Sequence, residues 1–187
     1  GNTTHDVELR ASAANRVHVR STKEIDRFGR LLSEHSDGIV GEPGDEITSH
    51  TEWTQNWRTW IHRSCRGYID GGTGDAATQL GLTETFYDGN TSDPCEITNR
   101  GLPTYSRTQL YTRAIDGSVI ATPQWLHGAV TVYNAEGLVT DVFTGGDPTT
   151  PSTTAHQHGS RAYDPHYRAA VILESIQYAM DGSTRLY

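Results

Sequence analysis

The sequence predicts an all-β fold, an antiparallel single jelly roll (β-sandwich) with long loops and at most one or two short helices. Apolar residues alternate with polar ones along eight or more short segments, which is the period of a half-buried strand. Gly, Asp and Asn separate these segments as turn formers, and strands do not alternate with helical patterns. The hydrophobic content of 34% is low. This suits two facing sheets, because each sheet buries only its inner face.

Four segments of the N-terminal half are predicted strands. Residues 7–11 and 16–20 alternate with a period of two and lie close enough for a hairpin or one bent strand. Residues 47–69 are rich in Trp and Thr, which favours a strand, although their spacing also fits one face of a helix. Residues 77–87 alternate again and end at a strong turn signal, residues 88–90.

One N-terminal segment, residues 25–35, has the spacing of a short helix. Its apolar residues fall on one helical face, namely Ile25, Phe28, Leu31 and Leu32. Gly29 weakens this helix by about 1 kcal/mol. We therefore expect a short helix here.

The C-terminal half carries the clearest hairpin patterns. Residues 105–115 and 118–122 flank an Asp-Gly turn, and residues 129–133 and 138–143 flank a turn that ends in Gly. Both turns place Gly where a positive φ is cheap. Residues 169–180 predict a final long strand, with a helix as the open alternative.

The length of 187 residues predicts a single domain, a β-sandwich over residues 1–187. Polar segments near residues 1–6 and 145–163 are predicted to be arms. The second of these is rich in Thr, Ser and Pro and is too long for a minimal connection. Loops of that length inside a compact domain are usually functional or make contacts with partners.

The charge distribution excludes several classes of function. The net charge is −8 and Lys23 is the single lysine among 15 basic residues, which indicates a salt-adapted organism or a GC-rich genome. We predict no direct binding to nucleic acid, because neutralising phosphates needs a basic stripe. No apolar run approaches the ~20 residues that span a bilayer.

Two cysteines, Cys65 and Cys95, lie 30 positions apart. They form a possible disulfide that would contribute about 3 kcal/mol, and two free buried thiols are equally compatible with the sequence. No Cys-x-x-Cys pattern is present, which argues against a thiolate metal or redox site.

His156 and His158 are the sharpest chemical signal. On a strand, positions i and i+2 share a face, so both imidazoles could bind one metal, with His166 or His127 as a third ligand. Enzymes of the cupin type use such a pair, together with a Glu a few residues later. No carboxylate follows here until Asp164, and we place the pair in the polar segment 145–163. We therefore predict two exposed histidines and no metal, with a cupin-like enzyme binding Zn, Fe or Mn as an alternative.

Other catalytic patterns are missing from the sequence. There is no Gly-x-Ser-x-Gly elbow, and Gly71 to Gly74 lack the lysine of a phosphate-binding loop. The carboxylate pair Glu84 and Asp88 is interpreted as solvated surface. We predict that the protein is not an enzyme and needs no cofactor.

With its acidic, arginine-rich composition and its order of strands and turns, the chain resembles the smaller major capsid protein of haloarchaeal icosahedral viruses that contain an internal membrane. The resemblance implies a viral structural protein, located in the virion and built as an upright single jelly roll. It also implies partners: copies of itself and a related larger capsid subunit in homo- or hetero-oligomers, with an underlying membrane reached through other proteins. The family has no catalytic residues to carry over.

A secreted carbohydrate-binding β-sandwich is a further alternative, with an extracellular location. It depends on Trp53, Trp57 and Trp60 lying exposed in a row.

Overall fold

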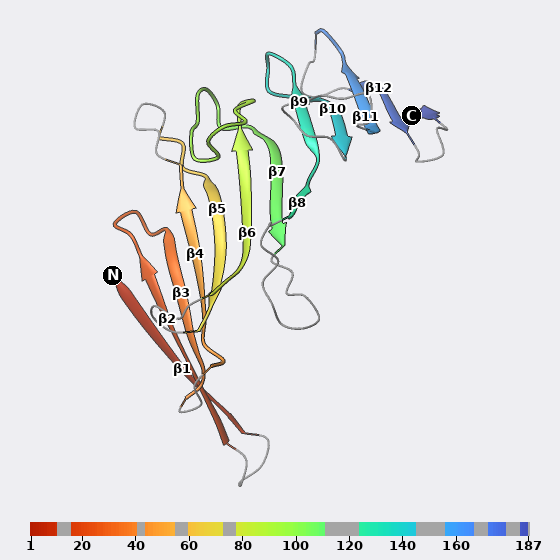
Figure 1. Ribbon diagram of the computed structural model, residues 1–187. Coiled ribbons are helices and arrows are strands. Elements are labelled where there is room, and N and C mark those ends of the chain that lie inside the picture. Colours follow the sequence, from red (N-terminus) through yellow and green to blue (C-terminus); the bar gives the residue numbers. More distant parts are fainter. Residues whose placement is uncertain are drawn as a thin grey trace. The chain divides into compact units, whose positions relative to one another are not determined.

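The computed structural model describes residues 1–10, 16–40, 44–54, 60–72, 78–110, 124–144, 156–166, 172–178 and 184–186. In these residues all the regular structure is β-strand, and every ladder whose register is defined is antiparallel (Figure 1). The predicted all-β, antiparallel class is therefore confirmed. None of the described residues forms a helix with the length and apolar character needed to cross a membrane.

The larger sheet has eight strands, which are neighbours in the order in which they follow one another along the chain. They are β1 (Asn2–Arg10), β2 (Arg16–Ile25), β3 (Leu31–Ile39), β4 (Ile47–Trp53), β5 (Ser64–Gly71), β6 (Thr78–Tyr87), β7 (Pro103–Leu110) and β8 (Gln124–His127).

The smaller sheet has five strands in the order β13-β12-β11-β10-β9, so its neighbours are also consecutive in the chain. They are β9 (Val130–Tyr133), β10 (Val139–Thr144), β11 (His156–Tyr163), β12 (Ile172–Tyr178) and β13 (Thr184–Leu186). Both sheets therefore have the strand order of an antiparallel meander.

The chain divides into two compact units that are interleaved in sequence. Unit 1 contains Gly1–Trp53, Ser64–Thr83 and Gln109–Gln124, and unit 2 contains Thr54–Arg63, Glu84–Thr108 and Trp125–Tyr187. Figure 1 shows the strands β1 to β5 of unit 1 side by side.

The first two strands form the hairpin that the N-terminal alternation predicts. Their register pairs Val7 with Val19 and extends to Asn2, which lies opposite Glu24. The amino group of Gly1 also donates to the carbonyl of Ile25, at 2.7 Å. Residues 2–6, predicted to be a polar arm, are instead part of β1, because their backbone groups continue the ladder with β2.

The helix predicted at residues 25–35 is wrong. β2 ends at Ile25 and β3 begins at Leu31, and these two residues face each other across a hairpin. Oδ1 of Asp26 accepts the backbone N–H groups of Phe28 and Arg30, at 2.8 and 3.0 Å. Gly29 has a φ of +81°, which a helix excludes. The Asp26 carboxylate accepts backbone N–H groups that would otherwise form helical hydrogen bonds, and the pairing of β2 with β3 then favours a hairpin over a helix.

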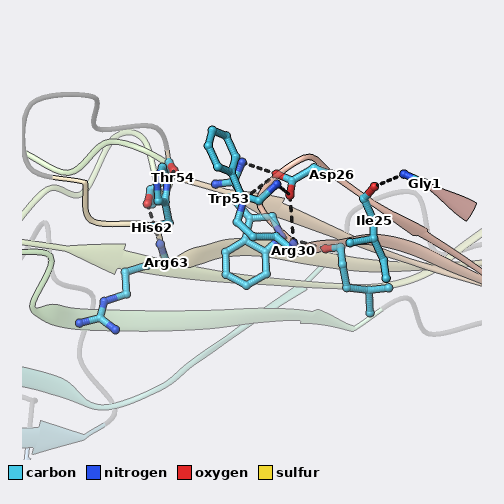
Figure 2. A network of polar contacts seen from close by, with 10 residues as sticks. Gly1, Ile25, Asp26, Arg30, Trp53, Thr54, His62 and Arg63 are labelled. Atoms are coloured by element: carbon cyan, nitrogen blue, oxygen red, sulfur yellow. Dashed lines mark hydrogen bonds and ion pairs between the residues drawn. The ribbon is translucent and has the colours of Figure 1, made fainter.

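The turn between β2 and β3 is also held by its side chains, as Figure 2 shows. Oδ2 of Asp26 accepts from Nε of Arg30 at 2.7 Å, and the Arg30 guanidinium lies 5.6 Å from the ring centroid of Trp53. Burial tends to raise the pKa of Asp26, but the hydrogen bonds from Arg30 and Phe28 outweigh it and lower that pKa. Nε1 of Trp53 donates to the carbonyl of Leu31 at 2.8 Å, which joins β4 to the start of β3.

Several other strand predictions are confirmed in the described residues. The segment 77–87 contains β6. The segment 47–69, predicted as one strand, is instead divided into β4 and the first residues of β5, which pair antiparallel with each other. The segments 129–133 and 138–143 form the hairpin of β9 and β10. Of the hairpin at 105–122, β7 is confirmed, and residues 111–123 lie outside the described residues.

The C-terminal segments need one correction. Residues 156–163, predicted to be part of a polar arm, form β11, and residues 145–155 lie outside the described residues. β11 lies between β10 and β12, so its backbone groups are paired on both sides. The predicted final strand is confirmed as β12, so the helical alternative is wrong over residues 172–178.

Buried apolar side chains in the described residues are few and lie mainly in unit 2. Phe86, Tyr87, Ile97 and Tyr105 are buried there, whereas Cys65 is the buried apolar residue of unit 1. Both Cys65 and Cys95 are disulfide-bonded, which confirms the predicted disulfide and excludes the free thiols.

This disulfide should be a large part of the stability of so lightly packed a protein. Closing a loop of about 30 residues in the unfolded chain is worth about 3 to 4 kcal/mol. We expect the double variant Cys65→Ser/Cys95→Ser to lose about this much free energy of unfolding in urea titrations. A reducing agent should destabilise the wild type equally and leave the double variant unchanged. Equal midpoints for the oxidised and reduced wild type would contradict the expectation.

Candidate functional site

The sheet of unit 1 lacks the burial pattern of a covered sheet. A strand with one face in a core alternates buried and exposed residues. All nine residues of β3 are instead of intermediate exposure, and in β4 Ile47 is exposed while the six others are intermediate. β5 has one buried residue, Cys65. In the described strands β3 to β5, both faces of the sheet therefore remain accessible.

The register gives this sheet two chemically different faces. One row across the strands joins Glu24, Ser33, His50 and Tyr68, and a second row on the same face joins Thr22, His35, Thr48 and Asp70. We call these eight residues the polar face. Alternate residues point to opposite sides of a sheet, so the rows between them form the other face.

Side-chain contacts cross the strands on the polar face. Nδ1 of His35 lies 2.8 Å from Oγ1 of Thr48. His50 stacks on the Tyr68 ring, with centroids 4.4 Å apart, and its Nε2 lies 3.4 Å from Oδ2 of Asp70. Burial, followed by the carboxylates of Glu52 and Asp70, raises the pKa of Tyr68. Cross-strand pairs of this kind contribute about 0.2 to 1 kcal/mol each, so they help to hold a sheet that has little core.

The opposite face carries exposed aliphatic side chains. Ile47 and Ile69 are 46% and 44% exposed, and Leu80 is 46% exposed. Gly71 is the register partner of Ile47, and a Cβ built on Gly71 would lie 2.9 Å from Cδ1 of Leu80. Since Ile69 is two residues before Gly71, all three side chains lie on one side. We call Ile47, Ile69 and Leu80 the aliphatic face.

An ion pair lies on the same side of the sheet as the aliphatic face. Nζ of Lys23 lies 3.3 Å from Oε1 of Glu34, in the row that continues to Ser49 and Ile69. Protein–protein contact surfaces typically have an apolar centre and a polar rim, and the aliphatic face with the neighbouring ion pair has this arrangement.

Unit 2 contains an ordered loop, residues 88–102, between β6 and β7. Its ends are joined by a hydrogen bond from the N–H of Asp88 to the carbonyl of Leu102, at 2.9 Å. The Asp88 carboxylate accepts four backbone N–H groups, from Asn99, Arg100, Gly101 and Leu102, at 2.8 to 3.2 Å. A compact loop with adjoining ends is an Ω-loop, a class that is frequently functional.

The four N–H donors decide the charge of Asp88. Burial tends to raise its pKa, but the hydrogen bonds from Asn99, Gly101, Leu102 and Arg100 together lower it. The carboxylate is therefore ionised at neutral pH and directed into its own loop. The sequence indicated a turn at residues 88–90, which is confirmed by positive φ values at Asp88 and Gly89 and by the bond from Asn90 N–H to the Tyr87 carbonyl.

A pocket of about 400 Å³ lies in unit 2, between this loop, the first residues of β7 and strand β9. The hydroxyl of Tyr133 on β9 donates to the carbonyl of Pro103 on β7, at 2.8 Å, which fixes these two walls. β9 is an edge strand of the smaller sheet. No local pattern in the sequence indicates the pocket, because its walls come from segments far apart in the chain.

The interpretation of Glu84 as solvated surface is wrong. Glu84 is buried, and its Oε2 lies 2.6 and 2.7 Å from Nη2 and Nε of Arg107. The Arg107 guanidinium is 4.1 Å from the Trp125 ring centroid and 5.0 Å from that of Phe86. Glu84 is therefore a structural partner of Arg107.

The histidines of the predicted metal alternative are not brought together among the described side chains. His156 and His158 lie on β11 rather than in a loop. The register with β10 shifts at this point: Gln157 pairs with Phe143 and Gly159 with Val142, so His158 lies at the shift. His166 is exposed, and the hydroxyl of Tyr105 is hydrogen-bonded to Nδ1 of His127. No group of three His, Cys, Asp or Glu that could hold a metal is found among the described residues. The side chains of His156 and His158 lie outside that description, so the metal alternative stays a prediction.

Two of the three tryptophans on which the carbohydrate-binding alternative depends are described, and one of these two is not fully exposed. Trp53 is half-buried and hydrogen-bonded to Leu31, whereas Trp60 is 73% exposed. Trp57 lies outside the described residues.

No protein-family profile matches the chain, and no curated protein sequence is significantly similar to it. The candidate sites therefore rest on the geometry itself, the uncovered sheet of unit 1 and the pocket of unit 2.

The Asp88 contacts predict a specific dependence of stability on pH. Because the folded-state pKa lies below the ordinary value of 3.8, the stabilisation is present above that value and is lost as the pH falls through the folded-state pKa. We expect Asp88→Asn to lower the free energy of unfolding by about 1 to 2 kcal/mol at pH 6. In urea titrations, the difference from the wild type should shrink between pH 4 and pH 2.5.

Asp93→Asn is the matched control in the same loop, because Asp93 Oδ1 accepts one backbone N–H, from Cys95 at 2.9 Å. It should cost less at pH 6 than Asp88→Asn. A difference between the Asp88 variant and the wild type that persists unchanged at pH 2.5 would contradict the assignment.

Proposed function

We propose that this protein is a structural assembly subunit, in which neighbouring subunits cover the sheet of unit 1. The observation that carries the proposal is the intermediate exposure of every residue of β3 and of six of the seven residues of β4, together with the exposed side chains of the aliphatic face. Soluble proteins that act as monomers rarely leave a contiguous apolar patch of large side chains in water. Covering the aliphatic face would remove that unfavourable contact.

The size of the sheet suits this role. Neighbouring strands lie about 4.8 Å apart and eight residues extend about 26 Å, so β1 to β5 offer a plane of roughly 600 Å². The accessible area of a corrugated surface is larger than its plane. A standard protein–protein interface takes about 800 Å² from each partner, so one sheet face is a sufficient contact.

The charge of the chain determines the conditions under which assembly should occur. Identical subunits of net charge −8 repel one another at low ionic strength. The Debye length falls from about 10 Å at 0.1 M salt to about 3 Å at 1 M, so molar salt removes most of this repulsion. Hydrophobic contact between aliphatic faces persists at high salt.

The viral capsid subunit is the particular form of this proposal, with the virion as its location. It is supported by the acidic, arginine-rich composition, by the all-β architecture and by the disulfide, a bond typical of oxidising environments that include virion surfaces. Copies of the chain and a related larger subunit would be its partners. The jelly-roll topology belongs to this form and requires pairing between strands distant in sequence. The two sheets instead pair consecutive strands. For this reason the structure supports the assembly class more strongly than the capsid form.

The proposal predicts oligomers that depend on the aliphatic face. In molar NaCl the wild type should form species larger than the 20.6 kDa monomer, measured by light scattering coupled to size exclusion across a salt series. Ile47→Glu and Ile69→Glu should each shift the population to monomer, because a carboxylate would have to be buried in the contact.

Leu126→Glu is the matched control, since Leu126 is also an exposed strand residue, at 63%, but lies on β8 in unit 2. It should leave the oligomer intact, and circular dichroism should show that all three variants are folded. A wild type that is monomeric at every salt concentration would refute the proposal. Equal loss of oligomer in the Leu126 variant would refute the role of the aliphatic face.

A further inference from the structure

We propose that the pocket of unit 2 binds a neutral saccharide, a function that is independent of assembly through unit 1. The pocket volume of about 400 Å³ lies within the usual range for small-molecule sites, about 300 to 1,000 Å³. It is distinct from the Trp53, Trp57 and Trp60 segment that suggested carbohydrate binding in the sequence.

The loop wall of the pocket is organised before any ligand arrives. Besides the four bonds to Asp88, Oδ1 of Asn90 accepts the N–H groups of Ser92 and Asp93, at 2.8 and 3.2 Å. Nδ2 of Asn90 donates to Oε2 of Glu96 at 2.8 Å, and Cys95 is held by the disulfide. A loop held in this way loses little conformational entropy on binding, which favours affinity.

The wall formed by β9 is equally well fixed. The turn after β9 is closed by Oδ1 of Asn134, which accepts the N–H groups of Glu136 and Leu138 at 3.1 and 2.9 Å. Tyr133 is bonded to Pro103, so its ring has a defined place in the lining. Burial raises the pKa of Tyr133, so this hydroxyl is neutral at physiological pH.

The side chains that line the pocket present neutral donors and acceptors. Among the described residues, the amide of Asn99 and the hydroxyls of Thr91 and Thr131 make no hydrogen bond to the protein. An amide supplies two donors and an acceptor, and a hydroxyl supplies both functions. Sugar hydroxyl groups need this mixture, because each of them is also both a donor and an acceptor.

Apolar surface completes the site. Tyr105 and Tyr133 contribute aromatic rings, and Leu102, Val130 and Val132 contribute aliphatic groups to the lining. An aromatic ring with a polar hydroxyl combines an apolar face with a polar edge. A saccharide has the complementary form, since C–H groups cover the faces of its ring and hydroxyls surround its edge.

The same lining disfavours other ligand classes. No Lys, Arg or His is among its residues, so an anionic ligand would lack a counter-charge in a protein of net charge −8. Its one carboxylate, Asp88, is already taken up by four backbone N–H groups, so a metal ion would lack ligands. A wholly apolar ligand would desolvate Asn99 and Thr131 without replacing their hydrogen bonds to water.

The test is saturation-transfer-difference NMR with a panel of neutral sugars, followed by calorimetric titration of the best binder. The panel contains glucose, galactose, mannose, N-acetylglucosamine and their β-linked disaccharides. We expect at least one sugar to bind. Asn99→Ala and Thr131→Val should each weaken its binding about three- to tenfold, the effect of one lost hydrogen bond.

Thr98→Val is the matched control, because Thr98 is exposed on the same loop and does not line the pocket. It should bind the sugar as tightly as the wild type, and all variants should keep the wild-type urea midpoint. Binding should change less than about twofold between 0.1 and 1 M NaCl, because a neutral ligand has no charge to screen.

Four results would overturn the proposal. The first is that no sugar of the panel binds at 10 mM, and the second is that both pocket variants bind the sugar with unchanged affinity. The third is that glucose 6-phosphate binds more tightly than glucose. The fourth is that an extended Thr-Val octapeptide, added as a β-strand ligand for the edge of β9, displaces the sugar. The last result would identify the pocket as a peptide groove.

Discussion

The accessibility of both faces of strands β3 to β5 in unit 1 is the constraint on which the rest of the molecule depends. A sheet without a covering layer gains little from apolar burial, so its strands must be held by ladder hydrogen bonds and by contacts between neighbouring side chains. The His50–Tyr68 stack and the Arg66–Glu52 ion pair, with 2.6 Å between Nη1 and Oε2, are contacts of this kind. The Asp26 turn closes one hairpin in the same way, through polar groups rather than a core.

Unit 2 also has few buried apolar residues, and polar contacts within one loop help to stabilise it. Its Ω-loop is held by one carboxylate, because Asp88 accepts four N–H groups that would otherwise have to find water or other partners. Ile97 is buried within that loop, and Phe86 and Tyr105 are buried on the strands beside it. The rigid wall that results is what allows neutral side chains such as Asn99 to face a pocket without competing protein partners.

Local pattern predicted most of the described strands but failed where two patterns were compatible with the same residues. Ile25, Phe28 and Leu31 fit a helical face, yet they lie across the end of one strand, a turn and the start of the next. The Asp26 side chain and the positive φ at Gly29 decided the outcome. His156 and His158 were placed in a loop because the composition around them is polar, although β11 pairs there with β10 and β12.

The sequence by itself determined the all-β class and some of the hairpins with their turns, such as the hairpin of β9 and β10. These follow from period-two alternation and from Gly, Asp and Asn, which act over a few residues. Only the tertiary structure decided which strands are neighbours, that both faces of the described strands β3 to β5 remain accessible, and that the loop at 88–102, β7 and β9 enclose a pocket. The reason is physical, because burial and cavities depend on contacts between residues far apart in the chain. A local sequence pattern does not specify those contacts.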